Sequence, residues 1–83
     1  MLTEFEDEII TSPGPCKFLS IAKEFEKAGV VSYAIDVYTK IIDKYPDTFE
    51  AVASRFALFL IANRYEKNGK KELAIPLMRR LNN

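Results

Sequence analysis

The sequence repeats itself with a period of 40 residues, and this repeat constrains the fold more than any other feature. Residues 18–43 align with residues 58–83 without a gap. A unit of about this length is one supersecondary element, and neighbouring units stack to bury a common core. We therefore expect two stacked units. The identical pairs are Ile21/Ile61, Ala22/Ala62, Glu26/Glu66, Lys27/Lys67, Gly29/Gly69, Ala34/Ala74 and Ile35/Ile75.

Apolar residues follow helical spacing inside each unit. Phe18, Ile21, Ala22 and Phe25 form one stripe, and residues 34–45 carry a second. Steps of three and four place such residues on one face of a helix. No segment shows the sustained alternation that is typical of a strand. The sequence predicts an all-α fold of two stacked antiparallel helix hairpins.

Proline and glycine mark several expected helix ends. Pro15 suits the first turn of a helix, where its missing N–H has no partner in any case. Gly29 and Gly69 suit the left-handed position that ends many helices. Pro46 stops the second helix, since proline interrupts the hydrogen bonds of a helix interior.

The third and fourth helices have their own boundary signals. Either Asp47 or Thr48 is expected to cap the third helix, with Glu50 as the capping-box partner of Asp47. This helix is expected to run to Asn68. Pro76 lies near the start of the fourth helix, where several N–H groups are unpaired, so we expect a modest bend and no break.

The run Pro13-Gly14-Pro15 separates an N-terminal arm from the helical part of the chain. The arm contains Leu2, Phe5 and Ile9 at helical spacing, together with four acidic residues and no basic one in residues 1–10. We divide the chain into an acidic arm with its linker at 1–14 and one helical-repeat domain at 15–83, with units at about 15–48 and 49–83.

Charge is balanced over the whole chain but not along it. The chain has 12 basic and 12 acidic residues. Residues 1–50 carry five basic and ten acidic side chains, whereas residues 51–83 carry seven basic and two acidic ones. These charges either belong to solvated helix faces or attract another chain of opposite charge. A net charge of zero argues against a general nucleic-acid binder.

Composition argues against catalysis and against a bound cofactor or metal. The chain has no histidine and one cysteine, Cys16, and it contains no glycine-rich phosphate loop. We expect a protein that is not an enzyme and that needs no cofactor. The longest apolar run, Phe56–Ala62, is far shorter than the roughly 20 residues that span a bilayer. Without a basic, apolar leader at residues 1–10, we expect a cytoplasmic protein with no membrane span.

Large, small and aromatic residues recur at matching positions in both units. They are Phe18, Ile21, Ala22, Phe25, Gly29, Ala34, Tyr38, Ile41 and Pro46 in the first unit, and Leu58, Ile61, Ala62, Tyr65, Gly69, Ala74, Met78 and Leu81 in the second. This pattern resembles the tetratricopeptide repeat. The repeat of that family is about 34 residues long, so the chain resembles a longer variant whose third helix is extended at its start.

The resemblance implies a scaffold that holds a segment of a protein or peptide partner in a groove lined by the first helix of each unit. Leu19 and Phe59 either supply apolar contacts to the partner or belong to the core. The groove positions of the family fall on Leu19, Lys23, Glu26 and Lys27, and on Phe59, Asn63, Glu66 and Lys67.

The fourth helix has no following helix to cover it, so we expect an exposed apolar surface there. Another copy of the chain, the N-terminal arm or a partner protein would cover it, and we favour a homo-oligomer. The expected self-association residues are Leu73, Leu77, Met78 and Leu81. The alternative function is binding of nucleic acid or another acidic surface through Arg64, Lys67, Lys70, Lys71, Arg79 and Arg80, with Tyr65 as a stacking ring.

Overall fold

Residues 14–82 are described by the computed structural model, and they fold into helices without a strand. The predicted all-α class is therefore confirmed. The arm, with Leu2, Phe5 and Ile9, lies outside the described residues. The helices are α2 (Pro15–Lys27), α3 (Val31–Lys44), α4 (Phe49–Lys67) and α5 (Lys71–Asn82).

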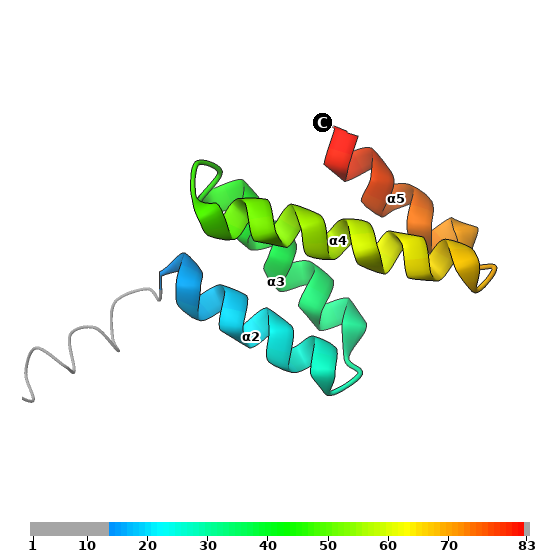
Figure 1. The fold of residues 1–83 in the computed structure, drawn as a ribbon, viewed down its shortest axis with the longest axis horizontal. Coiled ribbons are helices and arrows are strands. Elements are labelled where there is room, and N and C mark those ends of the chain that lie inside the picture. Colours follow the sequence, from blue (N-terminus) through cyan, green and yellow to red (C-terminus); the bar gives the residue numbers. More distant parts are fainter. Residues whose placement is uncertain (1–13, 83) are drawn as a thin grey trace, which may run out of the picture.

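The helices form two antiparallel hairpins, α2 with α3 and α4 with α5 (Figure 1). Helix α4 crosses over α3 and also touches α2, so it joins the two hairpins. Helix α5 packs against α4 at the opposite end of the stack from α2. The predicted hairpin architecture thus places the longest helix at its centre.

The two hairpin turns have the same backbone geometry. Gly29 has φ 84° and Gly69 has φ 78°, both in the left-handed region. Each follows a helix whose final carbonyls accept hydrogen bonds from the turn, as in Val30 N–H to Phe25 O and Lys70 N–H to Tyr65 O. Glycine adopts this conformation without the steric cost of a Cβ atom. The predicted roles of both glycines are confirmed.

The N-terminus of α4 decides between the two cap residues that the sequence allows, and it corrects the role predicted for Glu50. Thr48, and not Asp47, is the N-cap, and its Oγ1 accepts a hydrogen bond from Ala51 N–H at 3.1 Å. The same hydroxyl donates to the carbonyl of Tyr45 at 2.7 Å. Glu50 therefore lies in the first turn and does not act as the capping-box partner of Asp47. At the other end of the chain, α5 continues unbroken through Pro76.

The core lies around the inner face of α4, where most side chains are small. Ala51, Ser54, Ala57 and Ala62 are buried beside the larger Leu58 and Ile61. Small residues let the axes of neighbouring helices approach closely, and burial of each large side chain contributes about 1.5–3 kcal/mol. The hydroxyl of Ser54 is satisfied by donating to the carbonyl of Glu50 at 2.8 Å. The buried residues that α2, α3 and α5 contribute to the core are Ala22, Ala34, Tyr38, Ile41, Ile42, Ala74 and Leu77.

The expected apolar surface on α5 is largely covered by the chain itself. Leu77 is only 6% exposed, and Met78 and Leu81 pack against the core. The reason is that α5 folds back along α4 and turns this stripe towards it. The prediction that Leu77 is uncovered is therefore wrong, and the large apolar side chains exposed on α5 are Leu73 and Ile75.

One polar network links three helices near the turn between α2 and α3. The hydroxyl of the buried Tyr38 on α3 donates to Glu26 Oε1 on α2 at 2.7 Å. Arg64 on α4 lies 3.8 Å from the other oxygen of the same carboxylate. Burial raises the pKa of Tyr38 above its usual value, and the hydrogen bond and negative charge of Glu26 raise it further.

Replacing Gly69 by L-alanine is expected to lower the free energy of unfolding by about 1–2 kcal/mol, the cost of a left-handed conformation for an L-residue. A Cβ atom would meet nothing within 4 Å, so backbone strain is the sole cause. Urea unfolding followed by circular dichroism measures the change. A synthetic chain with D-alanine at residue 69 is the control, because a D-residue favours positive φ. Equal losses for both isomers would contradict the explanation.

Tyr38→Phe is expected to lower the free energy of unfolding at pH 7 by about 1.5–3 kcal/mol, the range for hydrogen bonds to charged groups. Because the folded-state pKa is raised, the stability from Tyr38 is complete below the unfolded value of about 10 and declines as pH rises above it. Urea unfolding between pH 7 and 11 should therefore show a smaller alkaline loss in Tyr38→Phe. Identical alkaline slopes in the two proteins would rule this out.

Candidate interaction surface

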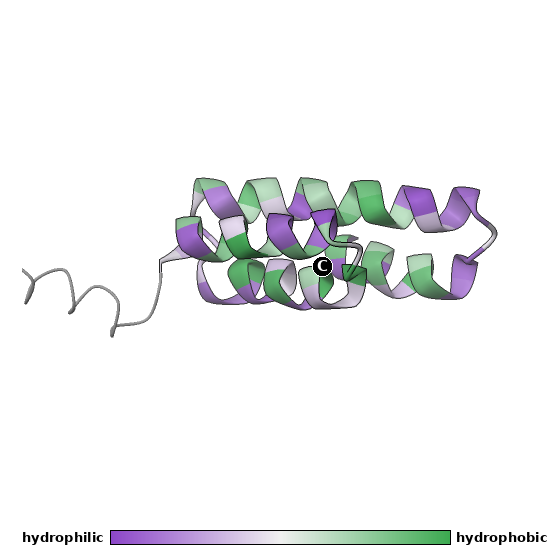
Figure 2. Cartoon of the chain, turned by 90° about the horizontal axis from the view of Figure 1, so that it is seen from below, coloured by the Kyte–Doolittle hydropathy of each residue, from purple (hydrophilic) through white to green (hydrophobic). Residues whose placement is uncertain are grey.

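A stripe of large apolar side chains is exposed along the outer face of α4. Their exposed fractions range from 42% for Phe59 to 81% for Phe49. Steps of three and four residues place them on one side of the helix. Figure 2 shows α4 as the uppermost helix, with apolar residues along its outer edge. We define the α4 stripe as Phe49, Val52, Phe56, Phe59 and Leu60.

The α4 stripe is large for a surface in contact with water. At about 150–250 Å² for a whole aromatic side chain, the exposed fractions amount to roughly 500 Å² of apolar surface. The largest apolar patch of a typical monomer is about 300–600 Å² and often serves in binding. Helix α4 is apolar on its inner face as well, so it carries two apolar faces, and an apolar helix face is normally covered.

Polar residues surround the stripe in an asymmetric way. Asn63 is half-buried and continues the stripe by one further step along α4. Asp47 and Glu50 lie at the N-terminal end of the helix, whereas Arg64, Glu66 and Lys67 lie in its last turn and Lys70 and Lys71 follow it. The surface therefore has an acidic end and a net basic end, and these charges are opposite in sign to the ends of the helix dipole beside them.

The predicted groove residues occupy mixed environments. On α2, Leu19 is half-buried against the core, whereas Lys23 and Lys27 are exposed. On α4, Phe59 belongs to the exposed stripe and Asn63 extends it. Glu66 and Lys67 are exposed near the end of α4.

Glu26 has a structural partner inside the chain. Its carboxylate accepts the hydrogen bond of Tyr38 and lies next to Arg64. Glu66 is the equivalent residue of the second unit. The position equivalent to Tyr38 is Met78 there, which has no hydroxyl to donate to a carboxylate. The two glutamates therefore differ in environment although the repeat aligns them.

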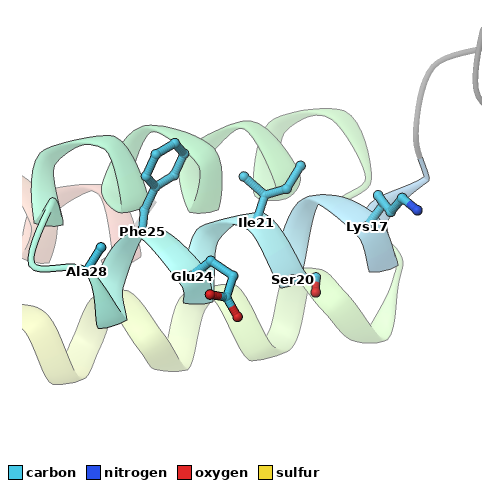
Figure 3. Close-up of a pocket in the computed structure, with 6 residues that line it drawn as sticks. All are labelled: Lys17, Ser20, Ile21, Glu24, Phe25 and Ala28. Atoms are coloured by element: carbon cyan, nitrogen blue, oxygen red, sulfur yellow. The ribbon is translucent and has the colours of Figure 1, made fainter.

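The outer face of α2 carries an open, largely apolar depression. Figure 3 shows Phe25 and Ile21 on the same side of α2 as Lys17. Ile21 is 38% exposed, whereas its repeat equivalent Ile61 is 1% exposed because α3 packs against that side of α4. Within residues 14–82, no helix takes the corresponding place beside α2. The depression is lined by Lys17, Ser20, Ile21, Glu24, Phe25 and Ala28.

The basic residues proposed for the alternative nucleic-acid surface are exposed on α4, α5 and the turn between them, whereas Tyr65 is half-buried. The Tyr65 side chain packs in part against the core. Arg64 is close to Glu26, and Arg80 on α5 is paired with Asp43 on α3. The latter pair is exposed, and such pairs contribute less than about 1 kcal/mol.

In residues 14–82, the acidic residues and the single cysteine are spread over helices α2 to α5 and the turns between them. No three metal-binding side chains of histidine, cysteine, aspartate or glutamate come together there. None of the helices from α2 to α5 has both the length and the apolar character that a membrane span requires.

Comparisons of the chain with protein-family models, with curated proteins and with solved structures gave no match.

Sequence reasoning missed four of the five residues of the α4 stripe, namely Phe49, Val52, Phe56 and Leu60. The signal was present in the run Phe56–Ala62, which contains no polar residue. A helix with one buried face needs polar residues at every third or fourth position. Their absence from this run indicates a helix with two apolar faces.

Proposed function

We propose that this chain is a protein–protein interaction module that binds through the α4 stripe. The observation that carries the proposal is the alignment of five exposed apolar side chains along one face of a single rigid helix. Interfaces are enriched in aromatic residues at their centre and have a polar rim. The three phenylalanines of the stripe and the charged residues at its two ends have this composition.

The proposal includes membership of a tetratricopeptide-like class of helical repeats. Its support is the matching geometry of the two hairpins, in which Gly29 and Gly69 take the same backbone conformation and Ala22, Ala34, Ala62 and Ala74 are all buried. In such repeats the first helix of each unit faces the partner, and α4 is the first helix of the second unit. We assign binding to the stripe because its aliphatic and aromatic side chains carry no acid, base or nucleophile.

A photo-crosslinking amino acid at position 56 tests this function directly. With p-benzoylphenylalanine in place of Phe56, illumination of the cells that naturally produce the protein should give covalent adducts with a protein. The matched control carries the same amino acid in place of Tyr33, which is 58% exposed on α3, compared with 62% for Phe56. Mass spectrometry identifies the protein in each adduct. An adduct with a second copy of the chain also supports the proposed function.

A further substitution tests whether adducts depend on the whole stripe. Phe49→Glu is exposed and should fold, yet it places a charge at one end of the apolar surface. It is expected to reduce the adducts formed from position 56 by about tenfold, a typical effect of truncating an interface anchor. Equal adduct yields at positions 56 and 33, or no adduct at either, would contradict the proposed function.

A further inference from the structure

We infer that a second copy of this chain covers the α4 stripe, with the two α4 helices packed antiparallel about a two-fold axis near Phe56. This inference deepens the proposed function and rests on it. Although α4 joins the two hairpins, Figure 2 shows it along one edge of the molecule, so its outer face can meet a second helix on the side away from α3 and α5.

The area of the stripe is sufficient for a small, specific dimer. Two stripes of roughly 500 Å² each would bury about 1,000 Å² between them, the lower limit of a biological interface. The charged residues at both ends of α4 would add to this area. An interface with the same patch on both copies is the commonest arrangement of homo-oligomers.

The charges at the helix ends favour the antiparallel orientation. In that arrangement the acidic end of one α4, with Asp47 and Glu50, lies beside the basic end of the other, with Arg64 and Lys67. A parallel pair would place like charges side by side at both ends. Opposite charges across an interface set orientation and suppress the wrong arrangement.

The side chains of the stripe are also complementary in size about this axis. An axis at Phe56 places Phe56 opposite itself, Val52 opposite Leu60 and Phe59 opposite Ala53. Ala53 is small and half-buried, so it leaves space for the ring of Phe59. Asn63 then lies opposite Phe49 at the margin, where its amide can remain hydrated.

Light scattering on the full 83-residue chain over a concentration series tests the inference. The wild-type chain should have twice the mass of one chain. Phe56→Glu and Phe56→Lys should each weaken the dimer by roughly 100-fold, since like charges then face each other at the axis. An equimolar mixture of the two variants should recover the dimer. Tyr33→Glu, at a site of similar exposure on α3, should leave it unchanged.

Disulfide formation tests the orientation. In a Cys16→Ser background, Val52→Cys and Leu60→Cys chains should form a mixed disulfide with each other and little with themselves. A parallel pair would give the reverse result and would overturn the inferred arrangement. Circular dichroism of each variant checks that its helix content is retained.

Other outcomes separate this inference from the proposed function. If the wild-type chain is monomeric up to about 1 mM, the inference of a second copy is overturned, because this concentration is far above the Kd of specific dimers. A chain that dimerises only after deletion of residues 1–13 shows that the arm covers the stripe, and it also overturns the inference. In either case, adducts with a different protein at position 56 would still support the interaction module. An oligomer unaffected by Phe56→Glu contradicts the assigned surface.

Discussion

The close approach of three helices to the inner face of α4 is the contact on which the rest of the structure depends. Alanine and serine side chains on this face let α3 and α5 pack near the α4 backbone, while Leu58 and Ile61 fill the remaining space. A large residue in place of Ala57 or Ala62 would separate the hairpins, because closely packed interiors tolerate added volume poorly. This contact holds α4 rigid and presents its other face to the solvent.

A rigid helix with two apolar faces is the physical basis of the functional proposal. The inner face is used within the chain, and the outer face exposes side chains that are costly to leave in water. Ordering such side chains before binding reduces the entropy lost in a complex. The hydrogen bond between Tyr38 and Glu26, with Arg64 nearby, connects α4 to α2 and α3 and so helps to hold the stripe in place.

Much of the fold follows from local signals in the sequence. Gly29 and Gly69 end their helices with positive φ, as their position after each apolar stripe predicts. The sequence predicts Asp47 or Thr48 as the cap of α4, and the hydrogen bond from Ala51 N–H to Thr48 Oγ1 shows that it is Thr48. Such signals depend on a few neighbouring residues, which is why they can be read without the tertiary structure.

Exposure depends on contacts between distant segments and is harder to predict. Ile21 and Ile61 are identical in the repeat, yet only Ile61 has a neighbouring helix to cover it. Leu77 was expected at the surface, but the return of α5 along α4 buries it. The repeat pattern assigns Leu58, Ile61 and Ala62 of the run Phe56–Ala62 to the core, but it assigns no role to Phe56 and Leu60, which lie on the opposite face of α4.

The measurement that tests the central claim most directly is an isotope-filtered NMR experiment on a mixture of labelled and unlabelled chains. The claim is that the outer face of α4 is covered by α4 of a second copy. We predict intermolecular contacts between the Phe56 rings and between the methyl groups of Val52 and Leu60. Intermolecular contacts confined to Leu73 and Ile75 on α5, or none at all, would contradict it.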